Sequence, residues 1–399
     1  MAGSAGGAGN AGTAGNAGNA GGGRSGTAGS GGASEAGSDA PAAGGGGSNA
    51  PDGAIVDASS GDATSADADA APSGPPPTLS ATGFFKAIGV DGGLELADGV
   101  RMYEPRYKLW SDGADKTRWV YLPAGTKIDN TDQDHWSMPV GTKFWKEFAL
   151  NGKRIETRFI HRFGPGPNDF LYATYWWKQV DGGAAPTDAT LVPLENNVSN
   201  ANGTDHDIPF EEHCHRCHDP LQEHVLGFSA FQLTSPPSPA PALAGVTLKT
   251  LNDEHLLTVA TPNGYEMPGS TAVIRDALGY LHANCGNCHN DTPGVNVPAP
   301  KMNLRVLVGQ HTPEETGAYT TALNQMNTKD DHLPVRLSYR IIGGDTQNSA
   351  VSVRMGLRGT TDGVPNQDQM PPLASEHVDT AGVTAVNAWI RGLPAPADH

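Results

Sequence analysis

The chain has 399 residues and a formal net charge of −17 at pH 7. Such an acidic chain is poorly suited to binding nucleic acid or an anionic membrane surface, because both are negatively charged. No apolar run approaches the roughly 20 residues of a membrane-spanning helix. The acidic surface is therefore expected either to be simply solvated or to dock a basic redox partner.

Residues 1–78 are predicted to be a disordered tether rather than a domain. The segment begins with a long run of Gly, Ala, Ser and Asn, continues with an Asp-rich stretch, and includes "GPPP" at 74–77. Such a sequence buries too little apolar surface to offset the entropy of ordering its backbone. Its start, "MAGSAGG", also lacks the basic residues and apolar core of an export signal.

Residues 79–205 are predicted to form a small antiparallel β domain. Runs rich in Val, Ile, Thr and aromatic residues alternate with Pro-Ala-Gly, Asn-Gly and Gly-Pro-Gly turns. The Asn-Gly pair at 151–152 separates two such runs and predicts a hairpin. Six tryptophans are expected mainly in the core, with an aromatic ligand-binding cleft as the alternative: Trp110, Trp119, Trp136, Trp145, Trp176 and Trp177.

All four cysteines belong to two copies of the pattern Cys-x-x-Cys-His. Two thiols three positions apart share one face of a helical turn, which suits two thioether bonds to a porphyrin, and the next imidazole can bind the iron. We therefore predict two covalently attached haem c groups, with each histidine as an axial iron ligand. The motif residues are Cys214, Cys217 and His218, then Cys285, Cys288 and His289.

Three other uses of the cysteines explain less. A structural zinc site usually separates its two Cys pairs by about 15–20 residues, whereas residues 218–284 intervene here. A thioredoxin-like motif needs a βαβ context that neither pair has, and disulfides would leave both histidines without a role. The flanking His213 and His215 are expected on the surface near a haem edge, not as ligands.

The first haem segment, residues 206–269, leaves the distal iron ligand open. Met267 is followed by proline, as a haem-binding methionine in a loop often is, and is the first candidate. His224, His255 and His282 are the rivals. The choice matters because a His/Met pair raises the reduction potential relative to a His/His pair.

The second haem domain, residues 270–399, has a more regular pattern. An amphipathic helix over 270–289 leads into the motif, and a closing helix is predicted near 380–391. Its apolar face comprises Val383, Val386, Trp389 and Ile390. Gly279 and Tyr280 are expected to let this closing helix cross the first one.

Residues 270–394 resemble a class I cytochrome c domain, in which a loop methionine precedes a C-terminal helix carrying an aromatic residue. The resemblance implies Met370, held in a loop by Pro371 and Pro372, as the distal ligand of the second haem. The segment 341–355 resembles the helix that precedes this loop, and within it Arg354 is a candidate to neutralise a haem propionate.

A wider resemblance covers about 84–310. The stretches "LWSDGADKTRWVYLPAGTKI", "HDIPFEEHCHRCHDP" and "ALGYLHANCGNCHN" resemble a family of exported bacterial dihaem c-type cytochromes with a β-rich N-terminal portion. The shared features include Ser111-Asp112, Lys116-x-Arg118 and Leu122-Pro123-x-Gly125. The resemblance implies electron transfer in the periplasm or on the outer cell surface, and it supplies no substrate.

The sequence thus predicts an α+β multidomain protein with a disordered tether, a small antiparallel β domain and a mainly α-helical dihaem region. We expect a non-enzymatic carrier of single electrons between redox proteins outside the cytoplasm. A dihaem peroxidase-type enzyme with one open iron position, or a β-domain ligand binder with a haem relay, are the alternatives. The tether resembles spacers of bacterial surface lipoproteins and would lead to a membrane anchor, although the anchoring cysteine is missing.

Overall fold

The computed structural model describes residues 74–90, 92–179, 185–292, 301–328, 337–361, 364–365, 368–373 and 375–396. The predicted tether therefore lies outside the described residues as far as residue 73. The chain contacts the β domain slightly before Leu79, because the Leu191 N–H donates a hydrogen bond to the Pro77 carbonyl at 3.0 Å. In the described part of the chain, no helix has the length and apolar character needed to cross a bilayer.

A six-stranded antiparallel sheet in the order β3-β4-β5-β6-β7-β8 forms the β domain, as predicted. The strands are β3 (Val100–Tyr103), β4 (Asp115–Tyr121), β5 (Lys143–Leu150), β6 (Lys153–Arg162), β7 (Phe170–Trp176) and β8 (Thr190–Leu191). A separate hairpin consists of β1 (Phe85–Ile88) and β2 (Leu94–Leu96). Asn151 and Gly152 both have positive φ, at 50° and 74°, as the predicted tight hairpin between β5 and β6 requires.

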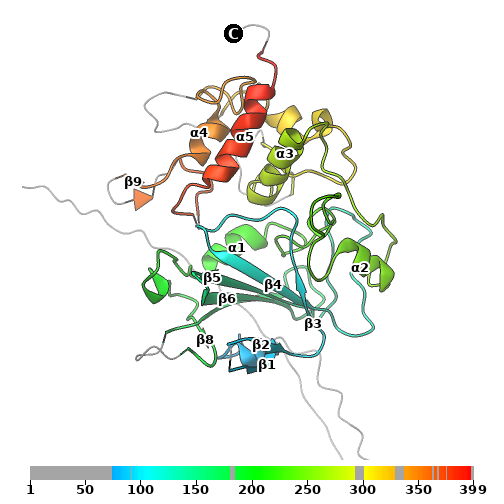
Figure 1. Ribbon diagram of the computed structural model, residues 1–399, viewed down its shortest axis with the longest axis vertical. Coiled ribbons are helices and arrows are strands. Elements are labelled where there is room, and N and C mark those ends of the chain that lie inside the picture. Colours follow the sequence, from blue (N-terminus) through cyan, green and yellow to red (C-terminus); the bar gives the residue numbers. More distant parts are fainter. Residues whose placement is uncertain are drawn as a thin grey trace, which may run out of the picture. The chain divides into compact units, whose positions relative to one another are not determined.

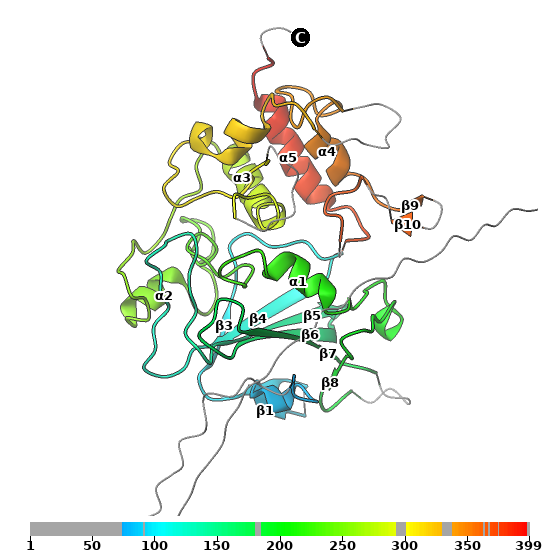
Figure 2. The ribbon, with the colours of Figure 1, turned by 180° about the vertical axis from the view of Figure 1, so that it is seen from behind.

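Each face of the sheet is covered by a different part of the chain. One face packs Trp119, Trp145 and Phe159 against the residues around β1 and β2. The opposite face, here called the α1 face, packs Val120 and Phe144 against the segment 225–257. This segment contains α2 (Leu248–Asp253), and α1 (Glu212–His218) lies over the same face (Figures 1 and 2).

The tryptophans follow the expectation of a core role in four cases. Trp119, Trp136, Trp145 and Trp177 are buried, whereas Trp110 and Trp176 are partly exposed. Even the partly exposed Trp110 has a structural contact, since its indole N–H donates to the His377 carbonyl at 3.0 Å.

Three helices carry the second haem domain: α3 (Ala272–Asn284), α4 (Ala350–Met355) and α5 (Thr380–Gly392). The closing helix therefore agrees with its predicted bounds, and Val386, Trp389 and Ile390 are buried while Val383 is partly buried. Helices α3 and α5 lie side by side (Figures 1 and 2). A short hairpin of β9 (Thr360–Thr361) and β10 (Val364–Pro365) precedes the Met370 segment.

The crossing of α3 and α5 depends on a different glycine from the one predicted. A Cβ on Gly382 of α5 would lie 2.1 Å from the ring of Tyr280, so this glycine permits the close approach. Gly279 instead accommodates Tyr107 from the β domain, whose ring would lie 2.1 Å from an added Cβ. The prediction was correct for Tyr280 and wrong for Gly279, because a contact from a distant segment occupies that face of α3.

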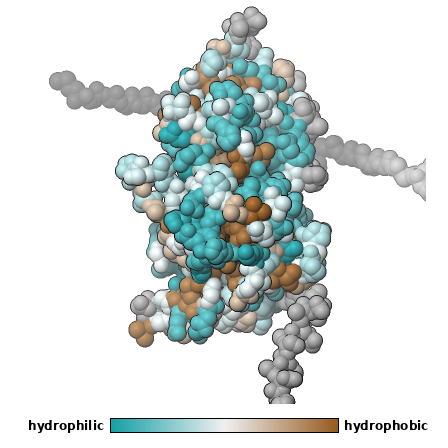
Figure 3. All heavy atoms as spheres, turned by 90° about the vertical axis from the view of Figure 1, so that its right-hand side faces the viewer, coloured by the Kyte–Doolittle hydropathy of each residue, from teal (hydrophilic) through white to brown (hydrophobic). Residues whose placement is uncertain are grey.

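The view in Figure 3 shows polar side chains over much of one side, with apolar residues gathered in small groups. This mixture accords with the polar, acidic composition of the chain.

Candidate cofactor sites

The second Cys-x-x-Cys-His motif is a tight turn at the end of α3. Thr271 caps the start of the helix by accepting a hydrogen bond from the Ile274 N–H, and the helix ends at Asn284. The N–H groups of Cys288 and His289 then donate to the Cys285 carbonyl at 3.1 and 2.8 Å. This folding places the two thiols and the imidazole at one cavity.

Glycine between the two cysteines is required by packing. A Cβ at Gly286 would lie 2.7 Å from the His282 carbonyl oxygen and 2.9 Å from the Cα of Arg305. Both atoms belong to the backbone, so they cannot move aside as a flexible side chain could. The glycine therefore allows the motif to sit directly against the 301–306 segment.

The cavity at this motif is mostly apolar. It spans about 950 Å³ of space, a figure that includes open solvent. Cys285, Cys288 and His289 line it together with Met370, which is distant in sequence. The other lining residues are Asn284, Met302, Leu304, Asn327, Thr328, Arg340, Ala350, Val351, Arg354, Met355, Pro371 and Pro372.

The donor atoms in this cavity suit haem iron. Burial and the charge of Arg340 lower the pKa of His289 to about 4, so its imidazole is neutral and can act as a ligand. The His289 Nδ1 is buried and has no hydrogen bond of good geometry among the described residues. The backbone of Met302 lies close to this ring and partly opposes the lowering of the His289 pKa. Burial also raises the pKa of Cys285 to about 12, which keeps this thiol protonated.

The methionine loop is anchored by the backbone. The Met370 N–H donates to the Arg354 carbonyl at 2.9 Å. The Arg354 side chain also lines the cavity and forms a buried ion pair with Asp368 at 3.1 Å. Arg354, which was predicted to face a propionate, therefore lines the same cavity as the second motif, and its role there remains a prediction.

The first motif lies entirely within α1 and over the α1 face of the sheet. The His218 Nδ1 forms a 2.7 Å hydrogen bond with the His224 carbonyl, an acceptor, so Nδ1 carries the proton and Nε2 keeps its lone pair. The ring centres of His218 and Tyr172 are 5.4 Å apart. Burial lowers the pKa of His218 to about 4, so this imidazole is also neutral.

Cationic side chains lie beneath this motif in a single row. Arg118, Lys146 and Arg158 are directly opposite one another on β4, β5 and β6, and so occupy the same face of the sheet. Arg158 pairs with the buried Glu156 at 2.6 Å. Burial raises the pKa of Cys214, and the charge of Arg158 only partly opposes this effect.

The two motifs meet at their second cysteines. A hydrogen bond between the thiols of Cys217 and Cys288 lowers the pKa of Cys217 to about 7 and raises that of Cys288. All four cysteines are free thiols. Asn284, next to the second motif, also contacts the β domain, because its side-chain oxygen accepts a hydrogen bond from the backbone N–H of Trp110 at 2.7 Å. Two segments far apart in sequence therefore form one candidate site.

The candidate distal ligands of the first haem lie in different surroundings. Met267 is 1% exposed and packs in a core with residues of α3 and α5, such as Leu278 and Val386, to which no residue of α1 contributes. His224 supports His218 from behind, since its carbonyl accepts the proton of His218 and its Nδ1 lies 2.7 Å from the Tyr172 hydroxyl.

The other two rival histidines also differ in their surroundings. His255 is exposed just after the end of α2. The Nδ1 of His282 accepts a hydrogen bond from the Val306 N–H at 3.2 Å, so the proton of this neutral ring is on Nε2. A ring in this tautomer cannot bind iron through Nε2.

The flanking histidines of the first motif agree with the predicted surface role. The side chain of His215 is 42% exposed and its Nδ1 lies 2.7 Å from Asp219. His213 packs on Phe210, with ring centres 4.2 Å apart.

The cationic row of Arg118, Lys146 and Arg158 was not predicted from the sequence. The alternation of Lys and Arg with apolar residues in β4 to β6 could have indicated it.

No family model, curated protein or solved structure matches the chain. Within the described residues, no group of three or more His, Cys, Asp and Glu side chains could hold a metal ion directly. A haem makes a smaller demand on the protein, which supplies one or two axial donors while the porphyrin supplies the rest. The second cavity fits such a group through its two thiols, its neutral imidazole and its methionine.

Proposed function

We propose that the chain is a dihaem c-type cytochrome that carries single electrons between redox proteins outside the cytoplasm. The observation that supports this best is the cavity that brings Met370 to the wall already formed by Cys285, Cys288 and His289. A thiol pair, an imidazole and a thioether around an apolar space are the groups that attach and ligate a haem. When bound, the haem would supply the one-electron chemistry.

The protein's own residues would hold and tune the cofactor. Cys285 and Cys288 would form thioether bonds, while His289 and Met370 would bind the iron from opposite sides. The apolar lining would exclude water and favour the less charged, reduced state of the iron. In the first motif, Cys214 and Cys217 would attach the other haem group. His218 would ligate its iron, and the His224 carbonyl orients this imidazole through a hydrogen bond.

The contact between Cys217 and Cys288 supports a carrier in which both groups act together. Cys217 and Cys288 would each attach one of the two groups, so their attachment points would be neighbours.

Covalent haem content tests the proposal directly. The full chain would be produced in a bacterial host with haem c maturation and export, with an added export signal. We expect two haem groups per chain that resist extraction by acidic acetone, and low-spin electron paramagnetic resonance signals from both irons. Colourless protein, or pigment that acidic acetone removes, would refute the proposal.

The peroxidase-type alternative has one observation in its favour. A smaller cavity is lined by Lys146, Arg305 and His282, together with Asn287 of the second motif, and none of its lining residues is methionine. An open iron position that faced this cavity would fit such surroundings. A high-spin signal in the resting oxidised protein, together with turnover of peroxide, would support this enzyme over the carrier, and two low-spin irons would exclude it.

A further inference from the structure

Arg118 on β4 is a buried cation without an evident partner. It is 3% exposed, and it forms no hydrogen bond or ion pair with any residue that the structure describes. Burial lowers its pKa, an effect that Tyr103 and Glu104 only partly oppose. A buried charge is costly unless it is paired, so the position calls for a negative group that approaches from outside the chain.

Lys146 extends this charge along the sheet. It lies directly opposite Arg118, and like charges in that position repel each other. Its amino group contacts the ring of Phe148 at 4.7 Å, and it forms no hydrogen bond or ion pair with the described residues. Burial and the charges of Arg118 and Arg158 lower the pKa of Lys146 well below its usual value.

Both cations line the small cavity beside the first motif. The cavity spans about 500 Å³ of space, a figure that includes open solvent, and its polar lining includes Ser229, Gln232 and Asn287. The first motif's own side chains are not part of the lining, whereas Asn287 belongs to the second motif. The face of the sheet that carries Arg118 and Lys146 also lies beneath α1, so the cavity has elements of both motifs around it.

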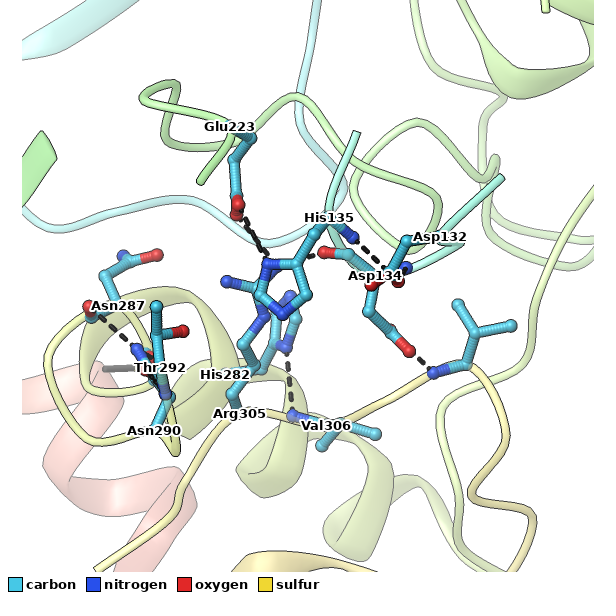
Figure 4. Close-up of polar contacts among 12 residues, drawn as sticks. Asp132, Asp134, His135, Glu223, His282, Asn287, Asn290, Thr292, Arg305 and Val306 are labelled. Carbon is cyan, nitrogen blue, oxygen red and sulfur yellow. Dashed lines mark hydrogen bonds and ion pairs between the residues drawn. The ribbon is translucent and has the colours of Figure 1, made fainter. Parts of the chain in front are cut away.

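The one carboxylate in the lining is already neutralised by other groups. Glu223 pairs with Arg305 at 2.8 Å and with His135 at 3.1 Å. Figure 4 shows Glu223, His135, Arg305 and His282 gathered in one cluster. Arg305 also donates to the Asp134 carbonyl, so this cluster satisfies itself. Arg118 and Lys146 are left as the basic groups of the cavity without an acidic partner among the described residues, and a bound carboxylate would favour the charged form of Lys146.

We propose that Arg118 and Lys146 form a binding site for a carboxylate in this cavity. The guanidinium can bind a carboxylate through two parallel hydrogen bonds, and the ammonium adds a point charge. The carboxylate can come from a propionate of one of the two proposed haems or from a free small acid. The first source rests on the proposed function, whereas the second does not.

The propionate source is tested by potentiometry on the full haem-loaded chain. Arg118→Gln removes a positive charge near one porphyrin and should lower the reduction potential of one haem while the other is unchanged. It should also shift the propionate vibration in the resonance Raman spectrum, and Arg118→Lys should restore most of the potential but not the vibration. Arg101→Gln is the matched control, because Arg101 lies on the neighbouring β3 and already pairs with Glu254 at the surface.

The free-acid source is tested by calorimetric titration of succinate into the same proteins. We expect succinate to bind the wild type saturably and to bind Arg118→Gln about tenfold more weakly or worse, because hydrogen bonds to charged groups have this strength. That result would support a free carboxylate as the ligand. Lys146→Gln provides a second variant at a partly exposed side chain, in case Arg118→Gln fails to fold. If succinate bound the wild type and the Arg118→Gln protein equally, it would be an adventitious ion only, and this result would count against the site.

The two failures are distinguishable. Colourless wild-type protein would contradict the haem assignment and leave the succinate titration as the test of this site. Haem-loaded protein in which Arg118→Gln and Lys146→Gln alter neither potential, nor vibration, nor succinate binding would overturn the carboxylate site and leave the haem assignment intact.

Discussion

The two Cys-x-x-Cys-His motifs have the same chemistry and opposite surroundings. In the second, the motif's side chains line an apolar cavity closed by Met370. In the first, the helix lies over a row of cations on a β-sheet, and the nearby cavity is lined by other, mostly polar residues. We therefore expect the pentapeptide to specify attachment only, while the element that packs on it determines what an attached group would experience.

The difference extends to how each histidine is held. His218 is oriented by a hydrogen bond to the His224 carbonyl. The side chain of His224 in turn forms a hydrogen bond with the hydroxyl of Tyr172 on the sheet. His289 is held by its burial in the cavity and lies near the Met302 carbonyl. We therefore expect variants of the sheet to affect the first site and variants of the α3–α5 unit to affect the second.

The largest effect should come from Met370→Ala. Loss of the thioether would leave the second iron with His289 as its one protein ligand, so this haem should become high-spin while the first is unchanged. Its reduction potential should fall by on the order of 100 mV, a modest part of the range that axial ligands span. Electron paramagnetic resonance and potentiometry on the haem-loaded chain measure both changes.

Met302→Ala is the control for that variant, because Met302 lines the same cavity. It should leave both irons low-spin. If Met302→Ala and Met370→Ala gave the same spin change, the identity of the distal ligand would be wrong, and if neither did, the cavity would not hold a methionine-ligated haem.

Met267→Ala should separate a ligand from a core residue. Because Met267 packs among Leu278, Leu281 and Val386, its truncation should cost about 2–5 kcal/mol of unfolding free energy without changing the spin state of either iron. Denaturant titration and electron paramagnetic resonance provide the two measurements. A high-spin first haem would instead identify Met267 as the distal ligand, as its Met-Pro sequence suggested.

Much of the second site could be predicted from sequence because its elements are consecutive and follow helical periodicity. The closing helix, the motif and the Met370 loop all have local patterns, and their meeting requires only that α3 and α5 pack together. The β hairpin at Asn151-Gly152 was equally local. The α+β character of the chain followed from these patterns.

The first site could not be derived in the same way, because its surroundings come from strands that are distant in sequence. The row of Arg118, Lys146 and Arg158 exists only when three strands adopt one register. The contact between Cys217 and Cys288 likewise depends on how α1 and α3 approach each other. A Met-Pro pair could not reveal that Met267 faces a core, since methionine is used for both purposes.

His282→Asn should alter the pH dependence of stability at the junction between the two sites. His282 belongs to α3 yet lines the cavity beside the first motif, and burial together with Arg305 lowers its pKa to about 3. The unfolded histidine binds a proton near its usual pKa of about 6.5, so stability is highest above that pH and falls as the pH decreases toward 3. At pH 4.5 this one group should cost about 3 kcal/mol relative to pH 7.

Asparagine can still accept the hydrogen bond from the Val306 N–H but does not titrate, so the variant should lose less stability between pH 7 and pH 4.5 than the wild type. Denaturant titrations at both pH values measure the difference. The exposed His311 provides the control, and His311→Asn should behave as the wild type does. Equal losses in wild type and His282→Asn would show that His282 is not buried as a neutral ring.

The smallest expected effect would test whether the sheet supports the first site specifically. Tyr172 and Tyr175 lie on opposite faces of β7. The Tyr172 hydroxyl lies 2.7 Å from His224 Nδ1, and the Tyr175 hydroxyl donates to the Pro76 carbonyl at 2.9 Å. Either change to phenylalanine should therefore cost about 1 kcal/mol of unfolding free energy. Only Tyr172→Phe should also shift the potential of the first haem, because only Tyr172 is linked through His224 to His218. Equal potentials in the two variants would mean that His218 is held by its own helix alone, and the contrast between the two motifs would then lie in their charges rather than in their supports.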